Sequence, residues 1–320
     1  MLLVLIEHDR GALAPAALEA VAFARALGRE VHALTLGAAA DGLAADLAAH
    51  GVDRVHQAHH DLLSDFGPDA WGGAVAAAIE TLAPDLVIAS GTDRGNEVLA
   101  HAAARLDLPF AANCTDLTLG RPLTLTRIRW GGSLLEHATL ESPTPIVSVA
   151  LHALDAEPAA APGAAEPTRL ALDLPASAAR TLVQARVERA AGLTLATAPV
   201  VVGGGRGVGS ADGFAALEDL AALLGGVVGC SRAVTNNGWR NHTDQVGQTG
   251  TRIAPEIYIA CGISGAIQHW VGAMASKHIL AVNTDPEANM VARAHSAVIG
   301  DLHEVVPAIA AEVRRRGSSA

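Results

Sequence analysis

Short apolar runs alternate with helical patterns along the chain, and this alternation constrains the fold more than any other feature. In the first half, β-like runs such as LLVLI (2–6) and DLVIAS (85–90) each precede an alanine-rich segment with helical periodicity. Strands that alternate with helices favour a parallel sheet with right-handed crossovers. The pattern predicts strands at 2–6, 31–36, 52–58 and 85–90, and helices at about 15–27, 42–49, 70–82 and 95–106.

After Pro109 the pattern changes. Three β-like runs at 124–130, 134–141 and 145–151 are separated by short turns, so we expect antiparallel additions to the first sheet. Segment 153–168 combines alanine, proline, glycine and acidic residues without an apolar period, which is typical of a linker or an extended surface segment. Residues 170–195 fit either a strand or a helix.

The alternation restarts at APVVVGGGRG (198–207), a strand that runs into a glycine-rich turn. Further strands are expected at 226–232, 256–262, 278–285 and 296–301, with helices near 212–224, from about 264, and up to about 314. The sequence therefore predicts an α/β protein with two open parallel-sheet domains, residues 1–190 and 191–320, of which the second is Rossmann-like.

Composition excludes several classes of protein. With 50% hydrophobic and 17% charged residues, the 320-residue chain is typical of a compact globular protein. Its net charge of −11 without a basic stripe argues against nucleic-acid binding. No apolar segment reaches transmembrane length, so we expect a protein that is not inserted in a membrane. Three scattered cysteines without a CxxC pair favour a reduced, cytoplasmic setting.

The strands of the second half share one property: each ends in polar residues or glycine. Carboxyl ends of parallel strands meet at one edge of a sheet, where ligands bind at a topological switch point. A loop start explains any single strand equally well, but five in succession favour a nucleotide or dinucleotide site. The residues at these ends are Gly205, Arg206 and Gly207, then Ser231 and Arg232, then Gly262 and Ser264, then Asn283 and Asp285, and finally Asp301.

Two glycine-rich stretches are candidates for a phosphate site. GGGRGVGS (203–210) lacks both GxGxxG and a P-loop lysine, but it sets Arg206 among backbone amides that can approach a phosphate. In CGISGAIQH (261–269), Gly262 permits a sharp exit from the strand, Ser264 is a candidate N-cap, and Gly265 lets a pyrophosphate approach a helix N-terminus. On local pattern alone, His269 is a half-buried helix histidine.

Other polar segments carry weaker signals. DQVGQTG (244–250) offers neutral donors and acceptors that suit a ring edge or hydroxyl groups. HQAHH (56–60) has no further ligand set, so a solvated loop is favoured over a metal site, and SGTDRGNE (90–97) is interpreted as a structural turn. No nucleophile with an oriented base is evident, so no catalytic residue is predicted.

Together these segments carry a resemblance. The order and spacing of GGRG (204–207), SR (231–232), QVGQTG (245–250) and PEIYIACGISGAIQH (255–269), followed by AVNTDPEA and GDL, resemble electron transfer flavoprotein alpha subunits. The resemblance spans essentially the whole chain and is most specific in 198–320. It implies an electron carrier without substrate turnover of its own, in fatty acid or amine oxidation. It also implies a heterodimer with a beta subunit, one FAD held mainly by the C-terminal domain, flavoprotein dehydrogenases as donors and a quinone oxidoreductase as acceptor.

The resemblance also implies roles for the two domains and for single residues. The N-terminal domain would be an adenine-nucleotide-hydrolase-like scaffold that contacts the beta subunit. Thr249 would lie at the flavin N5 edge, His269 near its O2 and Arg232 over the ring, where positive potential stabilises the anionic semiquinone. The implied FAD-binding residues are Arg206, Ser231, Arg232, Gln245, Val246, Gly247, Gln248, Thr249, Gly262, Ser264, Gly265, Ala266, Ile267, Gln268, His269, Asn283, Asp301 and Leu302.

Some positions depart from the family pattern. Thr251 stands where many relatives have lysine, NTDPEANM replaces the commoner NKDPEAPIF, and 234–244 differs from the usual loop. These changes suggest a specialised subgroup that serves an unusual dehydrogenase. Two alternatives are an NAD-binding oxidoreductase subunit and a nucleotide-binding sensor or scaffold. A third is a flavin-based electron-bifurcating variant, because the beta partner can hold either AMP or a second FAD.

Overall fold

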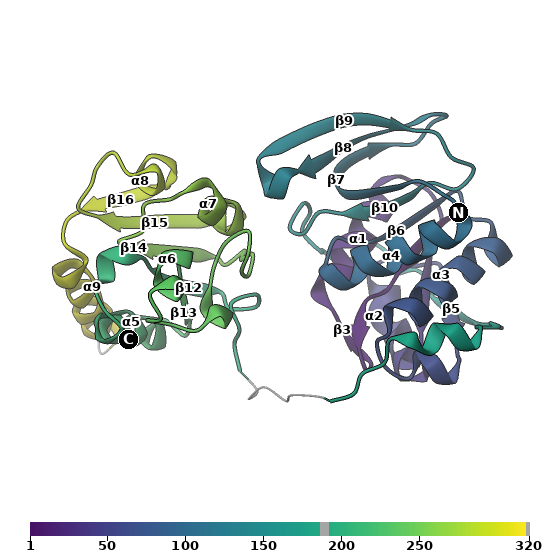
Figure 1. Cartoon of the computed structure of the whole chain (residues 1–320), viewed down its shortest axis with the longest axis horizontal. Coiled ribbons are helices and arrows are strands. Elements are labelled where there is room, and N and C mark those ends of the chain that lie inside the picture. Colours follow the sequence, from purple (N-terminus) through teal and green to yellow (C-terminus); the bar gives the residue numbers. More distant parts are fainter. Residues whose placement is uncertain (186–191, 318–320) are drawn as a thin grey trace. The chain divides into compact units, whose positions relative to one another are not determined.

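A computed structural model describes residues 1–185 and 192–317. It separates into two compact units, formed mainly by the described residues up to 185 and from 192 onward (Figure 1). The predicted domain boundary at residues 190 and 191 lies outside the described residues. The mixed α/β class with large parallel sheets is confirmed.

The first unit is built on a nine-stranded sheet with the order β11-β5-β4-β1-β6-β10-β7-β8-β9. The pairs from β11 to β7 are parallel, and β7-β8 and β8-β9 are antiparallel. The strands are β1 Leu2–Leu5, β4 Val31–Leu36, β5 Arg54–Ala58, β6 Leu86–Ser90, β7 Phe110–Thr118, β8 Leu123–Arg129, β9 Leu134–Leu140, β10 Ile146–Val149 and β11 Glu166–Leu170, with a separate ribbon of β2 His8–Asp9 and β3 Ala12–Leu13.

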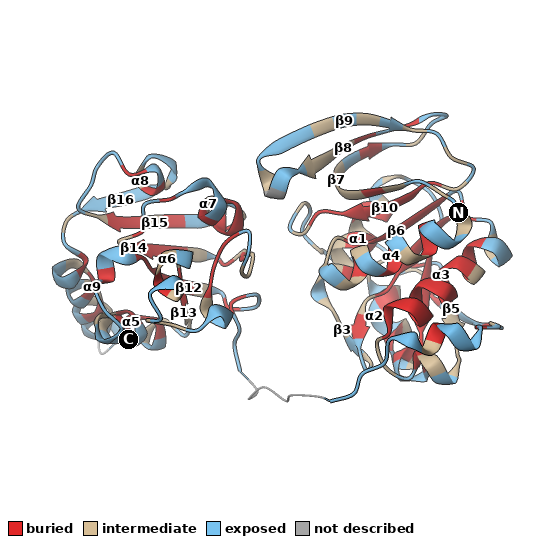
Figure 2. Cartoon of the chain, viewed as in Figure 1, coloured by how far each residue is buried: buried red, intermediate tan, exposed pale blue. Residues whose placement is uncertain are grey.

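Helices cover both faces of this sheet. One apolar cluster includes Ala20 of α1 (Pro15–Ala26) and Leu47 of α2 (Ala44–Ala49). The other includes Trp71 of α3 (Pro68–Leu82) and Leu99 of α4 (Asp93–Leu106). Strands β1 and β4 are buried along their whole length, which explains their continuous apolar sequences. The central strand β10 is buried in the same way (Figure 2).

One prediction for this unit is wrong. The run at 145–151 was expected to be antiparallel, but β10 lies between β6 and β7 and is parallel to both. The reason is that β7, whose sequence FAANCTDLT has no regular apolar period, leads into the β8-β9 hairpin before the chain returns to the centre of the sheet. The segment 153–168 was expected to be a linker or an extended surface segment, and its end fits the second alternative, because it forms the start of β11, an exposed edge strand that pairs with β5.

The second unit has a five-stranded parallel sheet with the order β13-β12-β14-β15-β16. The chain adds β13 on one side of β12 and β14 on the other, so the topological switch point lies between β12 and β14. The strands are β12 Val200–Gly204, β13 Val227–Cys230, β14 Ile257–Cys261, β15 His278–Asn283 and β16 Ser296–Ile299, and the helices are α5 Ala215–Leu223, α6 Arg232–Asn236, α7 Ile267–Ala273, α8 Asn289–Arg293 and α9 Leu302–Gly317.

Candidate functional site

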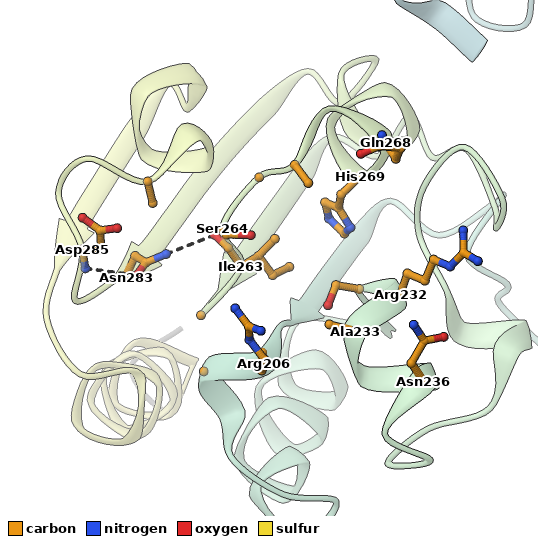
Figure 3. A pocket seen from close by; sticks show the side chains of 16 residues that line it. Arg206, Arg232, Ala233, Asn236, Ile263, Ser264, Gln268, His269, Asn283 and Asp285 are labelled. Carbon is orange, nitrogen blue, oxygen red and sulfur yellow. Dashed lines mark hydrogen bonds between the residues drawn. The ribbon is translucent and has the colours of Figure 1, made fainter. Parts of the chain in front are cut away.

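A cavity of about 670 Å³ opens at the carboxyl ends of β12, β13, β14 and β15 (Figure 3). The predicted strand ends therefore meet at one edge of the sheet, and the volume is within the usual range for a small-molecule site. The lining residues are Arg206, Gly207, Ser231, Arg232, Ala233, Asn236, Gly262, Ile263, Ser264, Gly265, Ala266, Gln268, His269, Asn283, Asp285 and Ala288.

The switch point is closed by backbone hydrogen bonds between two loops. Gly205 N donates to Cys261 O at 2.8 Å, and Gly207 N donates to Gly262 O at 3.1 Å. A Cβ at Gly205 would lie 2.1 Å from Gly262 O, so no other residue fits at this close approach. The loop directs the Arg206 side chain into the pocket (Figure 3).

In the stretch 261–269 the helix begins later than predicted, so Ser264 does not have the expected N-cap position. Gly262 and Gly265 have positive φ of 62° and 79°, and α7 begins only at Ile267, with Ala266 at the N-cap position. Ser264 is therefore not the N-cap but an exposed loop residue on the pocket wall. Gly265 is required because a Cβ there would lie 2.3 Å from Met290 N.

Asn283 joins the loops that follow β14 and β15. Its Nδ2 donates to Ile263 O at 3.0 Å, and its Oδ1 accepts from Asp285 N at 3.1 Å (Figure 3). The Asn283 amide thus holds the loop after β14 and the loop after β15 in place beside the pocket.

His269 is buried where α7 meets the pocket and is 7% exposed. Its Nε2 lies 2.8 Å from the Tyr258 hydroxyl, whereas Nδ1 is buried without a partner of hydrogen-bond geometry. Burial lowers the pKa of the imidazole to about 4, and the nearby Val246 carbonyl opposes this effect only partly. The ring is therefore neutral at pH 7, and Nδ1 is a polar atom that a ligand can satisfy.

Two guanidinium groups set the charge of the pocket. Within the described part of the chain, neither Arg206 nor Arg232 forms an ion pair. Asp285 is the one carboxylate in the lining, and its Oδ1 accepts from Glu287 N at 2.9 Å. The Arg232 side chain extends away from Arg206 (Figure 3), so positive charge lies at two separate places. In a chain of net charge −11, this pocket favours an extended anionic ligand.

Eight residues of the predicted set do not line this pocket. Gln245 is buried and bonded to its own loop and to α6, because Nε2 donates to Thr249 Oγ1 and Oε1 accepts from Thr235 Oγ1, both at 2.9 Å. Asp301 caps the first turn of α9 by accepting from His303 N at 2.9 Å. The eight are Gln245, Val246, Gly247, Gln248, Thr249, Ile267, Asp301 and Leu302, whereas Arg206, Ser231, Arg232, Gly262, Ser264, Gly265, Ala266, Gln268, His269 and Asn283 are brought together.

The pocket also contains residues that the sequence reasoning missed. Asn236 follows Arg232 by one helical turn, so helical spacing could have indicated it. The other missed lining residues are Ala233, Ile263 and Ala288, whereas Gly207 and Asp285 were predicted as strand-end residues.

The chemistry of the described residues is that of binding. They contain no cluster of three or more His, Cys, Asp or Glu side chains that could hold a metal ion. Burial raises the pKa of the Cys230 and Cys261 thiols to about 12, so these thiols are not nucleophilic. In the same residues, no helix is both long and apolar enough to span a bilayer. Separated cations, glycine-lined loops and an unpartnered imidazole nitrogen fit an extended dinucleotide such as FAD.

Comparison with known proteins identifies the family. Residues 2–175 match the electron transfer flavoprotein domain, and residues 194–274 match the electron transfer flavoprotein FAD-binding domain. The chain is 36% identical over 298 residues to the electron transfer flavoprotein subunit alpha of Clostridium acetobutylicum, covering 91% of this chain and 89% of the relative. It is 37% identical over 320 residues to the subunit alpha of Mycobacterium leprae, covering 98% of both. The resemblance expected from the sequence is confirmed: the chain belongs to the electron transfer flavoprotein alpha subunit family of electron carriers, and its second unit carries the family's FAD-binding domain.

Proposed function

We propose that this chain is the alpha subunit of a cytoplasmic heterodimer whose pocket at the carboxyl edge of the second sheet holds one FAD. The dimer accepts electrons from flavoprotein dehydrogenases and delivers them to a quinone oxidoreductase, without substrate turnover of its own. The observation that carries this proposal is the pocket itself, which sets Arg206, Arg232 and the unpartnered Nδ1 of His269 around one cavity within the FAD-binding region.

In this proposal the residues of the pocket bind and orient the cofactor. Arg206 and the exposed Ser264 hold phosphate oxygens, and Asn283 shapes the adenosine end together with Asp301. Bound FAD supplies one-electron and two-electron redox chemistry. The chain supplies the electrostatic environment that sets the flavin potential.

The structure refines the expected role of His269. Because its pKa is lowered to about 4 by burial, the ring contributes a hydrogen bond at neutral pH and not a formal charge. Arg232 remains the source of positive potential near the ring system. The loop Gln245–Thr249 contacts α7 through a 2.7 Å bond from Gln248 N to Gln268 O, which supports its proposed place beside the same ligand.

The remaining parts of the proposal concern the partner. The first unit, in the proposed domain of residues 1–190, serves as the scaffold that contacts the beta subunit, and residues 191–320 form the FAD domain. The beta subunit holds AMP in a simple carrier and a second FAD in a bifurcating one.

The test is co-expression of the chain with a candidate beta subunit. We expect the purified complex to have a flavin spectrum, to release one FAD plus AMP on extraction, and to be reduced by a flavoprotein dehydrogenase. Two FAD per complex would instead identify a bifurcating carrier. A colourless complex that binds neither FAD nor flavin fragments, or one that binds NAD in its place, would contradict the proposal.

A further inference from the structure

A buried tyrosine–histidine pair lies directly behind the pocket. Tyr258, the one tyrosine of the chain, is the second residue of β14 and is 0% exposed. Its hydroxyl lies 2.8 Å from His269 Nε2, and the two ring centroids are 6.0 Å apart. His269 points from α7 toward the pocket (Figure 3), whereas Tyr258 is not part of the lining. The tyrosine can therefore influence a bound ligand only through the histidine.

The available hydrogen-bond partners determine whether the Tyr258 hydroxyl or His269 Nε2 is the donor. Among the described residues, His269 is the only hydrogen-bond partner of the Tyr258 hydroxyl. If Nε2–H were the donor, the phenolic hydrogen would be buried without an acceptor, which costs about 1–3 kcal/mol. Donation from Nε2–H would also leave the Nδ1 lone pair unpaired, whereas donation from the hydroxyl to Nε2 leaves only the Nδ1 hydrogen without a partner, so the second arrangement is favoured. Burial also raises the pKa of Tyr258 well above its usual range, so the hydroxyl retains its hydrogen at neutral pH.

A neutral imidazole carries one ring hydrogen, so an accepting Nε2 places that hydrogen on Nδ1. Nδ1 is the one buried side-chain nitrogen or oxygen without a partner among the described residues. The Val246 carbonyl near the ring raises the pKa of His269 but does not reach hydrogen-bond geometry with Nδ1, so the Nδ1 hydrogen of this pocket-lining ring has no full partner within the described residues.

A glycine in the neighbouring strand leaves space for this hydroxyl. A Cβ at Gly203 on β12 would lie 2.2 Å from the Tyr258 hydroxyl oxygen. In the same run, a Cβ at Gly204 would meet the Phe214 ring at 2.3 Å and one at Gly205 would meet Gly262 O at 2.1 Å. Each glycine of GGG (203–205) therefore has its own packing reason, and the first leaves space for the tyrosine.

We propose that Tyr258 is a positioning residue of the cofactor site: its hydroxyl donates to His269 Nε2 and keeps the ring hydrogen on Nδ1, where it is available to an acceptor atom of the bound flavin. This inference rests on the proposed function in that it takes FAD as the ligand. A neutral N–H donor that is oriented in advance stabilises negative charge on the cofactor and so raises its reduction potential.

The first test does not need FAD. Nitrogen NMR of the full-length chain with labelled histidine reports which ring nitrogen of His269 carries hydrogen, and His269→Asn assigns the signal. We expect Nδ1–H with Nε2 as acceptor in the parent chain, and a shift toward the Nε2–H form in Tyr258→Phe, with both chains folded by circular dichroism. An Nε2–H form in the parent chain, or an unchanged tautomer in the variant, would overturn the inference.

The second test uses the FAD-loaded heterodimer. We expect Tyr258→Phe to weaken FAD binding about three- to tenfold, as loss of one hydrogen bond does, and to lower the one-electron flavin potentials. In a His269→Ala background the same substitution should no longer change the potentials, because the tyrosine acts through the histidine. Ser148→Ala, which removes a buried hydroxyl bond to Asn96 in the first unit, is the control and should leave the potentials unchanged. Equal shifts of the flavin potentials in both backgrounds would contradict the inference that Tyr258 acts through His269. A complex that takes up no FAD would contradict the proposed function alone.

Discussion

Asn283 concentrates two structural roles in a single side chain. Its amide bridges Ile263 O and Asp285 N, at 3.0 and 3.1 Å, and so holds the exits of β14 and β15 together. Without it, these backbone groups lose their partners beside the pocket, and the loops no longer have a fixed spacing.

We therefore predict that Asn283→Ala lowers the free energy of unfolding by about 1–2 kcal/mol and weakens FAD binding. Urea unfolding and FAD titration of the purified heterodimer measure the two effects. Asn237→Ala, an exposed asparagine just after α6, is the matched control. Unchanged stability and FAD affinity in Asn283→Ala would show that the bridge is dispensable.

The sequence predicted the residues of the pocket wherever a strand end or a family motif marked them. Arg206, Ser231, Gly262 and His269 are examples. The sequence could not predict that helix α7 begins three residues after Ser264. This later start depends on Gly265 packing against the Met290 backbone, a contact between residues distant in sequence. The bonding of Gln245 to its own loop and to α6 is equally invisible without tertiary contacts.

At the scale of elements, the junction of β12 and β14 leaves no room for a side chain at Gly205. Gly205→Ala would force a methyl group against Gly262 O, at 2.1 Å in the present backbone, and the two strand exits would have to separate. We predict a loss of about 1–3 kcal/mol of stability together with a large loss of FAD binding. Gly317→Ala at the end of α9 meets no atom within 4 Å and is the control. Normal FAD affinity in Gly205→Ala would contradict the assigned position of the site.

The pair β4-β5 contains an acid-sensitive histidine pair. His56 is 4% exposed, and its Nε2 lies 2.9 Å from His32 Nδ1. Burial, followed by His32 and Arg54, lowers the pKa of His56 from 6.5 to about 4. Between these values the unfolded chain binds a proton that the folded chain does not, so folding stability is complete above pH 6.5 and is lost as pH falls toward 4.

We predict that His56→Gln reduces this loss between pH 7 and pH 5 by on the order of 1–2 kcal/mol, although it can also lower stability at pH 7. Urea unfolding at both pH values gives the difference. His303→Gln, which replaces an exposed histidine, should leave the pH dependence unchanged. The same slope in His56→Gln and the parent chain would mean that His56 is protonated in the folded state.

Element types were predictable where a segment is apolar on both faces, as in β1 and β4. Strands β7 and β11 were not predicted, and β10 was predicted as a strand but with the wrong pairing direction. β11 is an exposed edge strand with a polar sequence, and the position of β10 depends on a non-local return of the chain to the centre of the sheet. Strand order of this kind is determined by tertiary contacts and not by local periodicity.

At the scale of the whole molecule, FAD bound in the pocket should stabilise the unit that contains it. A ligand present at 100 times its Kd adds about 2.7 kcal/mol to the folded state that binds it. We predict that adding FAD to the flavin-free heterodimer slows amide hydrogen exchange in strands β12 and β14 of this chain more than in β1 and β4. Equal protection of both sheets would indicate a different binding place.

The most direct test of the central claim is the FAD affinity of the heterodimer when a pocket cation is removed. Arg206→Ala should raise the Kd for FAD about 10- to 100-fold, because a charge-assisted hydrogen bond contributes about 1.5–3 kcal/mol. Arg316→Ala, which removes an exposed cation paired with Glu312 on α9, should leave the Kd unchanged. If both variants bound FAD as tightly as the parent complex, the pocket at the carboxyl edge of the second sheet would not be the FAD site.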